Sequence, residues 1–411
     1  MTAIQIGASA GERRSFQEVW VISIGHALTH WYPATFYLLL PLIGSELGLS
    51  YSQIGSILTC QFAAGAIANI PGGMFVDSVG RKGLLMALSL FWVGFPYLVM
   101  GFSHAYWMML ACATLVGIGN NLWHPTAIPW LANRFPDRKG LVMSFHGMGG
   151  NVGDAVAPLV VGALLAVFSW RNVVLLNVLP GIAMSALILF YIGRIYSRER
   201  VAATGPEKPA AVESGGRVRA LLALLRNRAL VTLSVSSTFR AMTQSALLTF
   251  LPVYLARDMG YSPFWIGACM FILQAAGFVA APIAGHLSDK MGRRQIVLSS
   301  MSMTAVVISA MAFSGGTIWF VALVAVLGFF LFAVRAVLQA WLLDATPPGM
   351  GGSAIGLLFC AQALGAAVGP VCAGLIADQY GIMAAFYFLA GTIVVANLMI
   401  FATPAELMKR P

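Results

Sequence analysis

The chain has 411 residues, of which 59% are hydrophobic and only 9% are charged. A soluble domain carries charge on about a quarter of its residues and cannot hide so much apolar surface in its interior. A lipid bilayer can accommodate it, because each spanning helix uses about 20 apolar residues. The excess of 24 Lys and Arg over 14 Asp and Glu does not indicate nucleic-acid binding, because no basic patch with interleaved aromatic residues accompanies it. The composition therefore excludes a soluble enzyme and predicts an all-α membrane protein.

Twelve apolar segments predict membrane-spanning helices in two groups of six. The polar residues 1–18, 197–228 and 404–411 predict an N-terminal segment, a solvated linker and a tail, which leaves six-helix bundles at 19–196 and 229–403. The helices are expected, in chain order, at 19–43, 53–75, 83–103, 105–131, 140–167, 172–196, 229–256, 263–287, 295–314, 317–343, 353–377 and 382–403.

The positions of the basic residues predict the orientation in the membrane. If the N-terminus is cytoplasmic, the basic loops and ends face the cytoplasm, and the opposite side keeps only Arg171 and Arg257. This distribution follows the positive-inside rule. We therefore expect a multi-pass protein of the bacterial inner membrane with both termini in the cytoplasm. The cytoplasmic set outside the linker is Arg13, Arg14, Arg81, Lys82, Arg134, Arg138, Lys139, Lys290, Arg293, Arg294, Lys409 and Arg410.

An internal repeat relates the two groups of helices. The pattern G-x-x-x-D-x-x-G-R followed by Lys or Arg occupies residues 73–82, after the second helix, and recurs at 285–294, 212 residues later. Two halves of six helices with the same inside–outside sense predict a pseudo-two-fold axis along the membrane normal, with a site between the halves. The same offset relates the fifth helix to the eleventh, in the pairs Gly153 and Gly365, Pro158 and Pro370, and Gly162 and Gly374.

The duplicated loops resemble the signature of the major facilitator superfamily, and the resemblance covers essentially the whole chain. It implies a carrier whose two halves rock about a central site. Each loop Asp lies at a helix end, where it can accept from a neighbouring helix N-terminus or pair with the loop Arg, and so latch one conformation. The alternative is that these charges serve only topology. The implied gating residues are Gly73, Asp77, Gly80, Arg81, Gly285, Asp289, Gly292 and Arg293.

Within the superfamily, the first half is similar to the fosmidomycin-resistance group of bacterial exporters. That group often has an acid four residues after the first-helix His and a Glu after His-Pro, where this chain has His30 and Thr126. The fifth helix, at 153–162, carries a degenerate form of a pattern found in proton-coupled antiporters. The similarity rests on Gly25-His26, Pro41, Leu49-Ser50, Gln53-Ile54-Gly55, Trp123-His124-Pro125, Gly149-Gly150-Asn151 and Gly153.

Ionisable residues inside the predicted helices are functional candidates, because a charge in the hydrocarbon costs about 2.5–3.5 kcal/mol on insertion scales. Asp154, Arg240 and Arg335 lie well inside helices, and several histidines, among them His146, join them. Polar residues four apart share one helix face. Such pairs occur in helices 1, 4, 7 and 10, which line the central cavity in the superfamily. The pairs are His26 and His30, Asn120 and His124, Arg240 and Gln244, and Arg335 and Gln339.

The repeat places these polar groups at equivalent positions in the two halves. An offset of 211 superposes Arg335 on His124 and sets Arg240 beside His30. The planar guanidinium fork suits carboxylate or phosphonate oxygens, so we expect a small organic anion between Arg240 and Arg335. The alternative is a structural ion pair between one Arg and Asp154. Further hydrogen bonds to the substrate are expected from His26, His30, His124, Gln244 and Gln339.

Asp154 is the leading candidate for proton coupling, because an embedded carboxylate can change protonation with substrate occupancy. The favoured function is secondary active transport by alternating access, as proton-coupled efflux of a small organic anion or an amphipathic drug-like compound. Proton-linked uptake of an organic anion is the alternative within transport. A metal-ion carrier using the histidines is disfavoured because the arginines repel a cation, and a non-transporting membrane receptor is the last alternative.

The expected partners are a small-molecule substrate, protons and the lipid bilayer, and we expect the chain to function as a monomer. No nucleophile with a base, phosphate-binding loop or haem motif is recognisable, so the chain is not expected to be an enzyme or to hold a cofactor. The five cysteines lie in apolar runs without metal-ligand spacing and predict small core residues, not a metal site.

Overall fold

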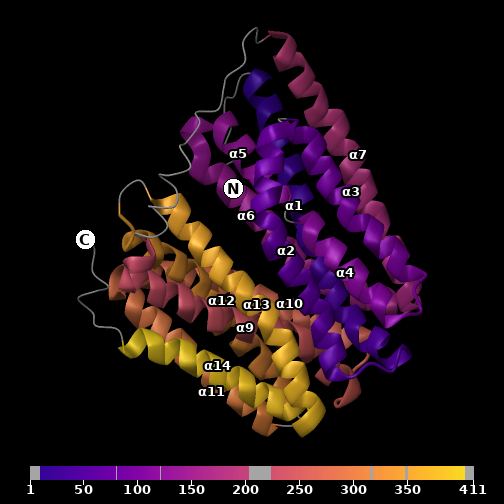
Figure 1. The fold of residues 1–411 in the computed structure, drawn as a ribbon, viewed down its shortest axis with the longest axis vertical. Coiled ribbons are helices and arrows are strands. Elements are labelled where there is room, and N and C mark those ends of the chain that lie inside the picture. The colour runs from indigo at the N-terminus through magenta and orange to yellow at the C-terminus, as the bar shows by residue number, and fades with distance from the viewer. Residues whose placement is uncertain are drawn as a thin grey trace, which may run out of the picture.

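The computed structural model describes residues 10–79, 81–120, 122–202, 224–314, 318–347 and 350–402, and almost all of them are helical. The predicted architecture is confirmed: twelve spans form two six-helix halves related by a pseudo-two-fold axis (Figure 1). The first half comprises α1 (Ala10–Glu46), α2 (Tyr51–Val79), α3 (Lys82–Gly101), α4 (Tyr106–Asn120), α5 (Trp123–Arg134), α6 (Lys139–Leu165) and α7 (Trp170–Ala202), with a 3-10 turn η1 (Pro136–Arg138). The second half comprises α9 (Arg228–Arg257), α10 (Pro263–Met291), α11 (Arg293–Ser314), α12 (Ile318–Asp344), α13 (Gly351–Tyr380) and α14 (Ile382–Ala402).

The fourth predicted helix, 105–131, is two helices in the structure. α4 ends at Asn120 and α5 begins at Trp123, so the prediction of one continuous helix was wrong. Asn side chains compete with the helical hydrogen bonds of the backbone, which favours an end at this point. The break places His124 in the first turn of α5.

Two helices extend beyond their predicted ends. α1 begins at Ala10, and within this extension Glu18 is buried and accepts a hydrogen bond from Arg134 of α5 (Nη2–Oε1, 3.2 Å). α7 continues to Ala202, into the predicted linker. Outside the described residues lie most of that linker (203–223), the predicted tail (404–411), the start of the predicted N-terminal segment (1–9) and Gly80.

The helices run between two sides of the molecule. We call the side where α1 begins the terminus side, and the side where α1 ends at Glu46 the far side. In Figure 1 the two halves meet along a seam, and their ends lie further apart on the terminus side, where α1 begins and α14 ends.

The seam consists of close backbone contacts that obey the pseudo-two-fold axis. A Cβ added at Gly55 of α2 would collide with the carbonyl oxygen of Pro370 in α13. The equivalent contact, 212 residues away in both partners, joins Gly267 of α10 to the carbonyl oxygen of Pro158 in α6. Only glycine permits helices to approach so closely. A second symmetric pair of contacts joins Gly374 to Tyr51, and Gly162 to Pro263.

The hydrophobic core is shared between the halves only toward the far side. There one continuous cluster combines first-half residues such as Phe36 and Ile54 with second-half residues such as Phe250 and Leu273. Toward the terminus side each half has its own separate cluster. The halves are therefore packed together on the far side.

Hydrogen bonds between the halves also lie toward the far side. Asp378 of α13 accepts from the backbone N–H groups of Tyr51 (2.7 Å) and Ser52 (2.9 Å) at the start of α2. A carboxylate at this position satisfies free N–H groups and interacts favourably with the helix dipole. Deeper in the seam, the hydroxyl of Thr59 donates to the carbonyl oxygen of Ala367 (2.6 Å).

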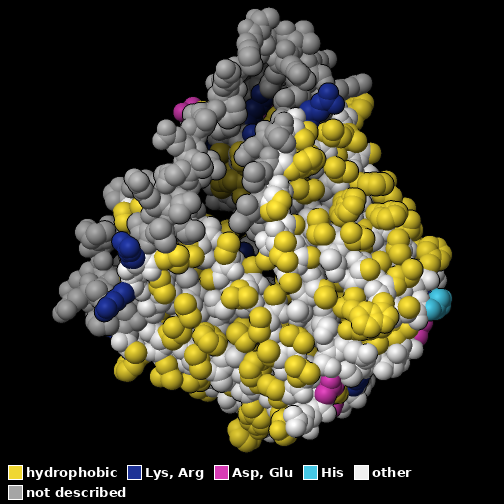
Figure 2. Space-filling view, in the orientation of Figure 1, with side chains coloured by type: hydrophobic (Ala, Val, Ile, Leu, Met, Phe, Trp, Pro, Cys, Tyr) yellow, Lys and Arg dark blue, Asp and Glu magenta, His cyan; other side chains and the backbone are white. Residues whose placement is uncertain are grey.

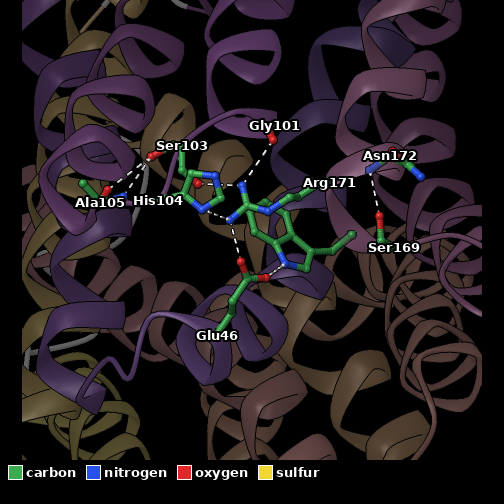
Figure 3. A network of polar contacts seen from close by, with 9 residues as sticks. Glu46, Gly101, Ser103, His104, Ala105, Ser169, Arg171 and Asn172 are labelled. Atoms are coloured by element: carbon green, nitrogen blue, oxygen red, sulfur yellow. Dashed lines mark hydrogen bonds and ion pairs between the residues drawn. The ribbon is translucent and has the colours of Figure 1, made fainter.

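A polar network connects helix ends on the far side of the first half (Figure 3). Arg171, at the start of α7, donates to Glu46 at the end of α1 (2.5 Å) and to the carbonyl oxygen of Ser103 in the α3–α4 loop (2.6 Å). Trp170 lies under the Arg171 guanidinium, 4.3 Å from it, and donates its indole N–H to Glu46 (2.5 Å). Three separate stretches of chain are joined by this one arginine.

The outer surface matches a lipid environment. On the described part of the face seen in Figure 2, hydrophobic side chains are spread over the whole surface, and charged side chains are few. Large apolar residues such as Phe102, Trp107 and Phe313 are more than two-thirds exposed. Eight of the described helices, namely α3, α6, α7 and α10 to α14, are long and apolar enough to cross a membrane by length and composition.

Candidate functional site

A cavity lies between the halves. One part, of about 290 Å³, is lined by α1, α5 and α6 from the first half and by α9, α10 and α12 from the second. A second part, of about 480 Å³, extends toward α2 and α13. His124, Gln244 and Arg335 line both parts, so they mark the centre. All seven residues predicted to bind substrate, as well as Asp154, line one part or both.

The first-half wall contains a cluster of histidines. His26 is buried and its Nδ1 donates to the carbonyl oxygen of His146 (2.6 Å), so it ties α1 to α6. Its Nε2 lies 3.0 Å from Nε2 of His124 on α5. The His26 and His30 rings meet edge to face, with centroids 4.7 Å apart. Gly150 makes this packing possible, because a Cβ there would come within 2.8 Å of His26 and 3.0 Å of His30.

Asp154 is paired with a histidine, not with an arginine. Its Oδ2 lies 2.9 Å from Nδ1 of His30, and both side chains are partly exposed to the cavity, at 29% and 26%. The structural Arg–Asp154 ion pair considered from the sequence is therefore wrong. The juxtaposition follows from the contact of α1 with α6, where Gly153 approaches the carbonyl of Ala27.

The second-half wall carries two arginines without carboxylate partners among the described residues. Arg240 of α9 is 2% exposed and donates from Nη1 to Oε1 of Gln244 (2.8 Å), while its buried Nε has no hydrogen-bond partner. Arg335 of α12 is exposed and lines the cavity. Within the described part of the chain, no ion pair or hydrogen bond involves Arg335. Gln339 lines the cavity one turn further along α12.

The cavity is also lined by residues of helices that carry none of the polar pairs found in the sequence. Gln274 of α10, Gln362 of α13 and Asn151 of α6 contribute amide groups. Their helices read as Gly-rich packing segments in the sequence, which gave no signal for them. Asn120, by contrast, shares a face with His124 in the sequence but is not among the residues that line either part of the cavity.

The predicted gating motif forms a charge network in the second half. Arg293 contacts Asp289 (Nη1–Oδ1, 2.6 Å), Asp344 at the end of α12 (Nε–Oδ2, 3.3 Å) and the hydroxyl of Ser288 (2.5 Å). In the first copy the Arg81 side chain is exposed, while Gly80 and the Asp77 side chain lie outside the described residues. Both copies are on the terminus side.

Three histidines lie close enough together to be considered as the ligands of a metal ion. Candidate ligand nitrogens of His26, His124 and His146 all lie within 4.8 Å of one another. However, His26 and His146 are stacked, with centroids 3.9 Å apart and planes 11° from parallel. Lone pairs in two parallel ring planes cannot point at one ion, so this arrangement does not fit a tetrahedral site.

Two pseudo-symmetric helical halves around a polar cavity define a membrane transport protein. The chain belongs to the Major Facilitator Superfamily, whose sequence profile matches residues 22–317 and 233–411. It is therefore a multi-pass membrane protein of a family of secondary transporters. This confirms the family resemblance drawn from the duplicated loops.

Individual relatives are distant but cover nearly the whole chain. The fosmidomycin resistance protein of Escherichia coli is 26% identical, over 95% of this chain and 93% of that protein. The phosphoglycerate transporter protein of Salmonella typhimurium is 23% identical, over 97% of this chain and 90% of that protein. The crystal structure of a bacterial homolog to the human lysosomal transporter Spinster has a TM-score of 0.79 at 16% identity, covering 96% of this chain and 97% of that one.

Proposed function

We propose that this transporter exports a small organic anion in exchange for protons. The observation that carries the anion proposal is the pair of unneutralised guanidinium groups: Arg335 lines the cavity with no carboxylate partner among the described residues, and Arg240 bonds only to the neutral Gln244. A buried charge without a counter-ion is costly, and an anionic ligand supplies that counter-ion. Arg also presents a fork that matches carboxylate and phosphate oxygens.

Similarity to two transporters supports the same substrate class. Phosphoglycerate is a small organic anion and fosmidomycin is a phosphonate, so both relatives are named for compounds with anionic oxygens. The amphipathic drug-like compounds expected from the sequence fit the site only if they carry such a group.

Proton coupling is assigned to Asp154 together with His30. This hydrogen-bonded pair lines the cavity, close to where a bound anion would lie. Protonation of Asp154 weakens its contact with His30, and protonation of His30 strengthens it. Either change can be linked to whether a substrate is bound. Export is favoured by the similarity to the fosmidomycin resistance protein, and proton-linked uptake is the other direction that the same site allows.

We further propose that the terminus side is cytoplasmic, in agreement with the positive-inside rule. The far side, where the halves are packed together, is then closed to the periplasm, and the cavity faces the cytoplasm. Asp289, Arg293 and their first-half counterparts would form and break contacts as the halves rock. The cavity is complete within a single chain, which supports function as a monomer.

The test is transport by the purified chain in proteoliposomes with an imposed pH gradient. Phosphoglycerate and fosmidomycin serve as anionic probes and ethidium as a cationic drug. We expect pH-driven movement of an anion that Arg240→Ala or Arg335→Ala reduces at least tenfold, since each charged hydrogen bond is worth about 1.5–3 kcal/mol. Asp154→Asn should retain anion exchange but lose the response to pH.

Arg228→Ala is the matched control, because it removes an exposed positive charge at the start of α9, outside the cavity and outside the gating motif. It should leave transport unchanged. If ethidium alone is transported, or if both arginine variants keep full anion transport, the anion proposal is wrong. If Asp154→Asn keeps pH-driven transport, coupling does not pass through Asp154.

A further inference from the structure

The hydrogen bonds of the histidine cluster determine which ring nitrogen is left for a ligand. The carbonyl oxygen of His146 can only accept, so Nδ1 of His26 carries the proton and Nε2 of His26 is a lone-pair acceptor. Nε2 of His124, 3.0 Å away, must then be the donor. The remaining nitrogen of neutral His124, Nδ1, is therefore an acceptor, and the exposed His124 lines both parts of the cavity.

The same argument applies to the neighbouring hydrogen bond between neutral His30 and Asp154. An ionised Asp154 only accepts, so Nδ1 of His30 is the donor in their 2.9 Å contact. Nε2 of neutral His30 and Oδ1 of Asp154 are left as acceptors, with no hydrogen-bond partner among the described residues. Together with His124, they give the first-half wall an acceptor face.

The opposite wall presents donors. Arg335 has only N–H groups to offer. Because Oε1 of Gln244 is occupied by Arg240, the amide N–H groups of Gln244 are what remain for a ligand. The buried Nε of Arg240 is a further donor without a partner. Amide side chains such as Asn151 and Gln339 offer both kinds of group. Apart from them, the acceptors of His124, His30 and Asp154 on one half face the donors of Arg335 on the other across one cavity.

We propose that the cavity selects organic anions that carry hydroxyl groups at the end opposite their acid group. The acid group meets the arginines, and the hydroxyl groups donate to His124, His30 and Asp154. An unsubstituted acid of the same size leaves these acceptors without donors, which is costly in a desolvated site. This inference rests on the proposed anion site and deepens it.

The charges of the cavity favour a hydroxy acid over an amino acid. Arg240 and Arg335 contribute two positive charges, and Asp154 contributes one negative charge that is already paired with His30. The excess is positive, so a ligand with a net negative charge neutralises the site better than a zwitterion. A zwitterion would also set its ammonium group against a positive surplus.

The test compares acids of equal charge with and without hydroxyl groups, by calorimetric titration of the full chain in lipid nanodiscs. The pairs are D-glycerate against propionate, and D-galacturonate against cyclohexanecarboxylate, with L-serine as the zwitterion. We expect each hydroxylated acid to bind at least about tenfold more tightly than its partner, as one or two well-made hydrogen bonds predict. L-serine should bind more weakly than D-glycerate.

Variants of the acceptor face test whether it causes the preference for hydroxylated acids. His124→Phe should reduce the ratio of glycerate to propionate affinity toward one, and His124→Gln, which keeps an acceptor, should restore part of it. His286→Phe is the control, because His286 is an exposed histidine of α10 that does not line the cavity. Thermal unfolding of each variant verifies that it is folded.

The outcomes separate this inference from the function on which it rests. If both members of each pair bind equally, and Arg335→Gln weakens both, the anion site stands and the acceptor face is wrong. If L-serine binds more tightly than D-glycerate, the hydroxy-acid preference is also wrong. If none of the five compounds binds, the anion site and the inference fail together.

Discussion

The Asp378 carboxylate of the second half accepts a hydrogen bond from the backbone N–H of Tyr51 in the first half, at 2.7 Å. Its other oxygen accepts from Ser52 at 2.9 Å, so a single side chain caps the start of α2 across the seam. We expect this contact to break when the far side opens. Asp378 therefore contributes to the stability of one conformation relative to the other.

Removing this cap should shift the conformational equilibrium toward opening of the far side. Loss of a helix cap costs about 0.5–2 kcal/mol, which corresponds to a change of about twofold to thirtyfold in the equilibrium. Asp378→Ala should have a larger effect than Asp378→Asn, because Asn keeps one acceptor. Spin-label distances across the far side provide the measurement. Asp258→Asn, at an exposed far-side acid, should leave them unchanged, and an equal shift in that variant would contradict the role of Asp378.

Two glycines with similar surroundings should respond differently to alanine. Gly153 contacts the carbonyl of Ala27 within the first half, whereas Gly55 contacts that of Pro370 across the seam. Overpacking costs about 1–3 kcal/mol. Gly153→Ala should lower the unfolding temperature, while Gly55→Ala should fold and populate the state with an open far side. The symmetry-related Gly267→Ala should behave like Gly55→Ala. If Gly55→Ala instead lowers the unfolding temperature as much as Gly153→Ala does, the seam does not separate.

The charge network at Arg293 should govern turnover more than binding. Arg293 joins Asp289 to Asp344 and hence α10 to α12 on the terminus side, away from the cavity. Arg293→Ala should slow transport severalfold with ligand affinity unchanged, and partly exposed ion pairs predict a loss of stability of only about 1 kcal/mol or less. Arg294→Ala is the control, since Arg294 donates to the carbonyl of Phe401 instead. A change in affinity without a change in maximal rate would contradict this role.

The far-side network of Arg171 should matter for stability alone. Arg171 holds Glu46 and the carbonyl of Ser103 within the first half. Arg171→Ala should reduce the free energy of unfolding by about 1–3 kcal/mol, because several hydrogen bonds to a charged group are lost together. Thermal unfolding in lipid nanodiscs gives the stability, and titration gives the affinity. Weaker ligand binding at normal stability would argue against a structural role.

The fold could be predicted from the sequence, because the two halves keep glycines and prolines at equivalent positions. Gly55 and Gly267 occupy equivalent positions, and so do Pro158 and Pro370, and the structure joins them in symmetric contacts. Helix periodicity placed the polar pairs on single helix faces, since residues four apart share a face. The resemblance to the superfamily then implied that the faces of His124, Arg240 and Arg335 line a common cavity.

The pairing inside the cavity could not be predicted in the same way. Periodicity gives the face of one helix but not the height at which two helices meet. The sequence left open whether Asp154 would meet an arginine, and the close contact of α1 with α6 set it beside His30 instead. The break between α4 and α5 was missed although Asn120 and Pro125 mark it in the sequence, because the apolar segments on either side together have the length of one span.

The separation of donors and acceptors between the two halves has a consequence for the path of a ligand. The two faces are opposed across the seam, and not stacked along the direction of transport. A ligand held between Arg335 and His124 therefore has no reason to turn over as the halves rock. We expect it to leave the protein in the same orientation in which it entered, with its acid group directed toward the second half throughout.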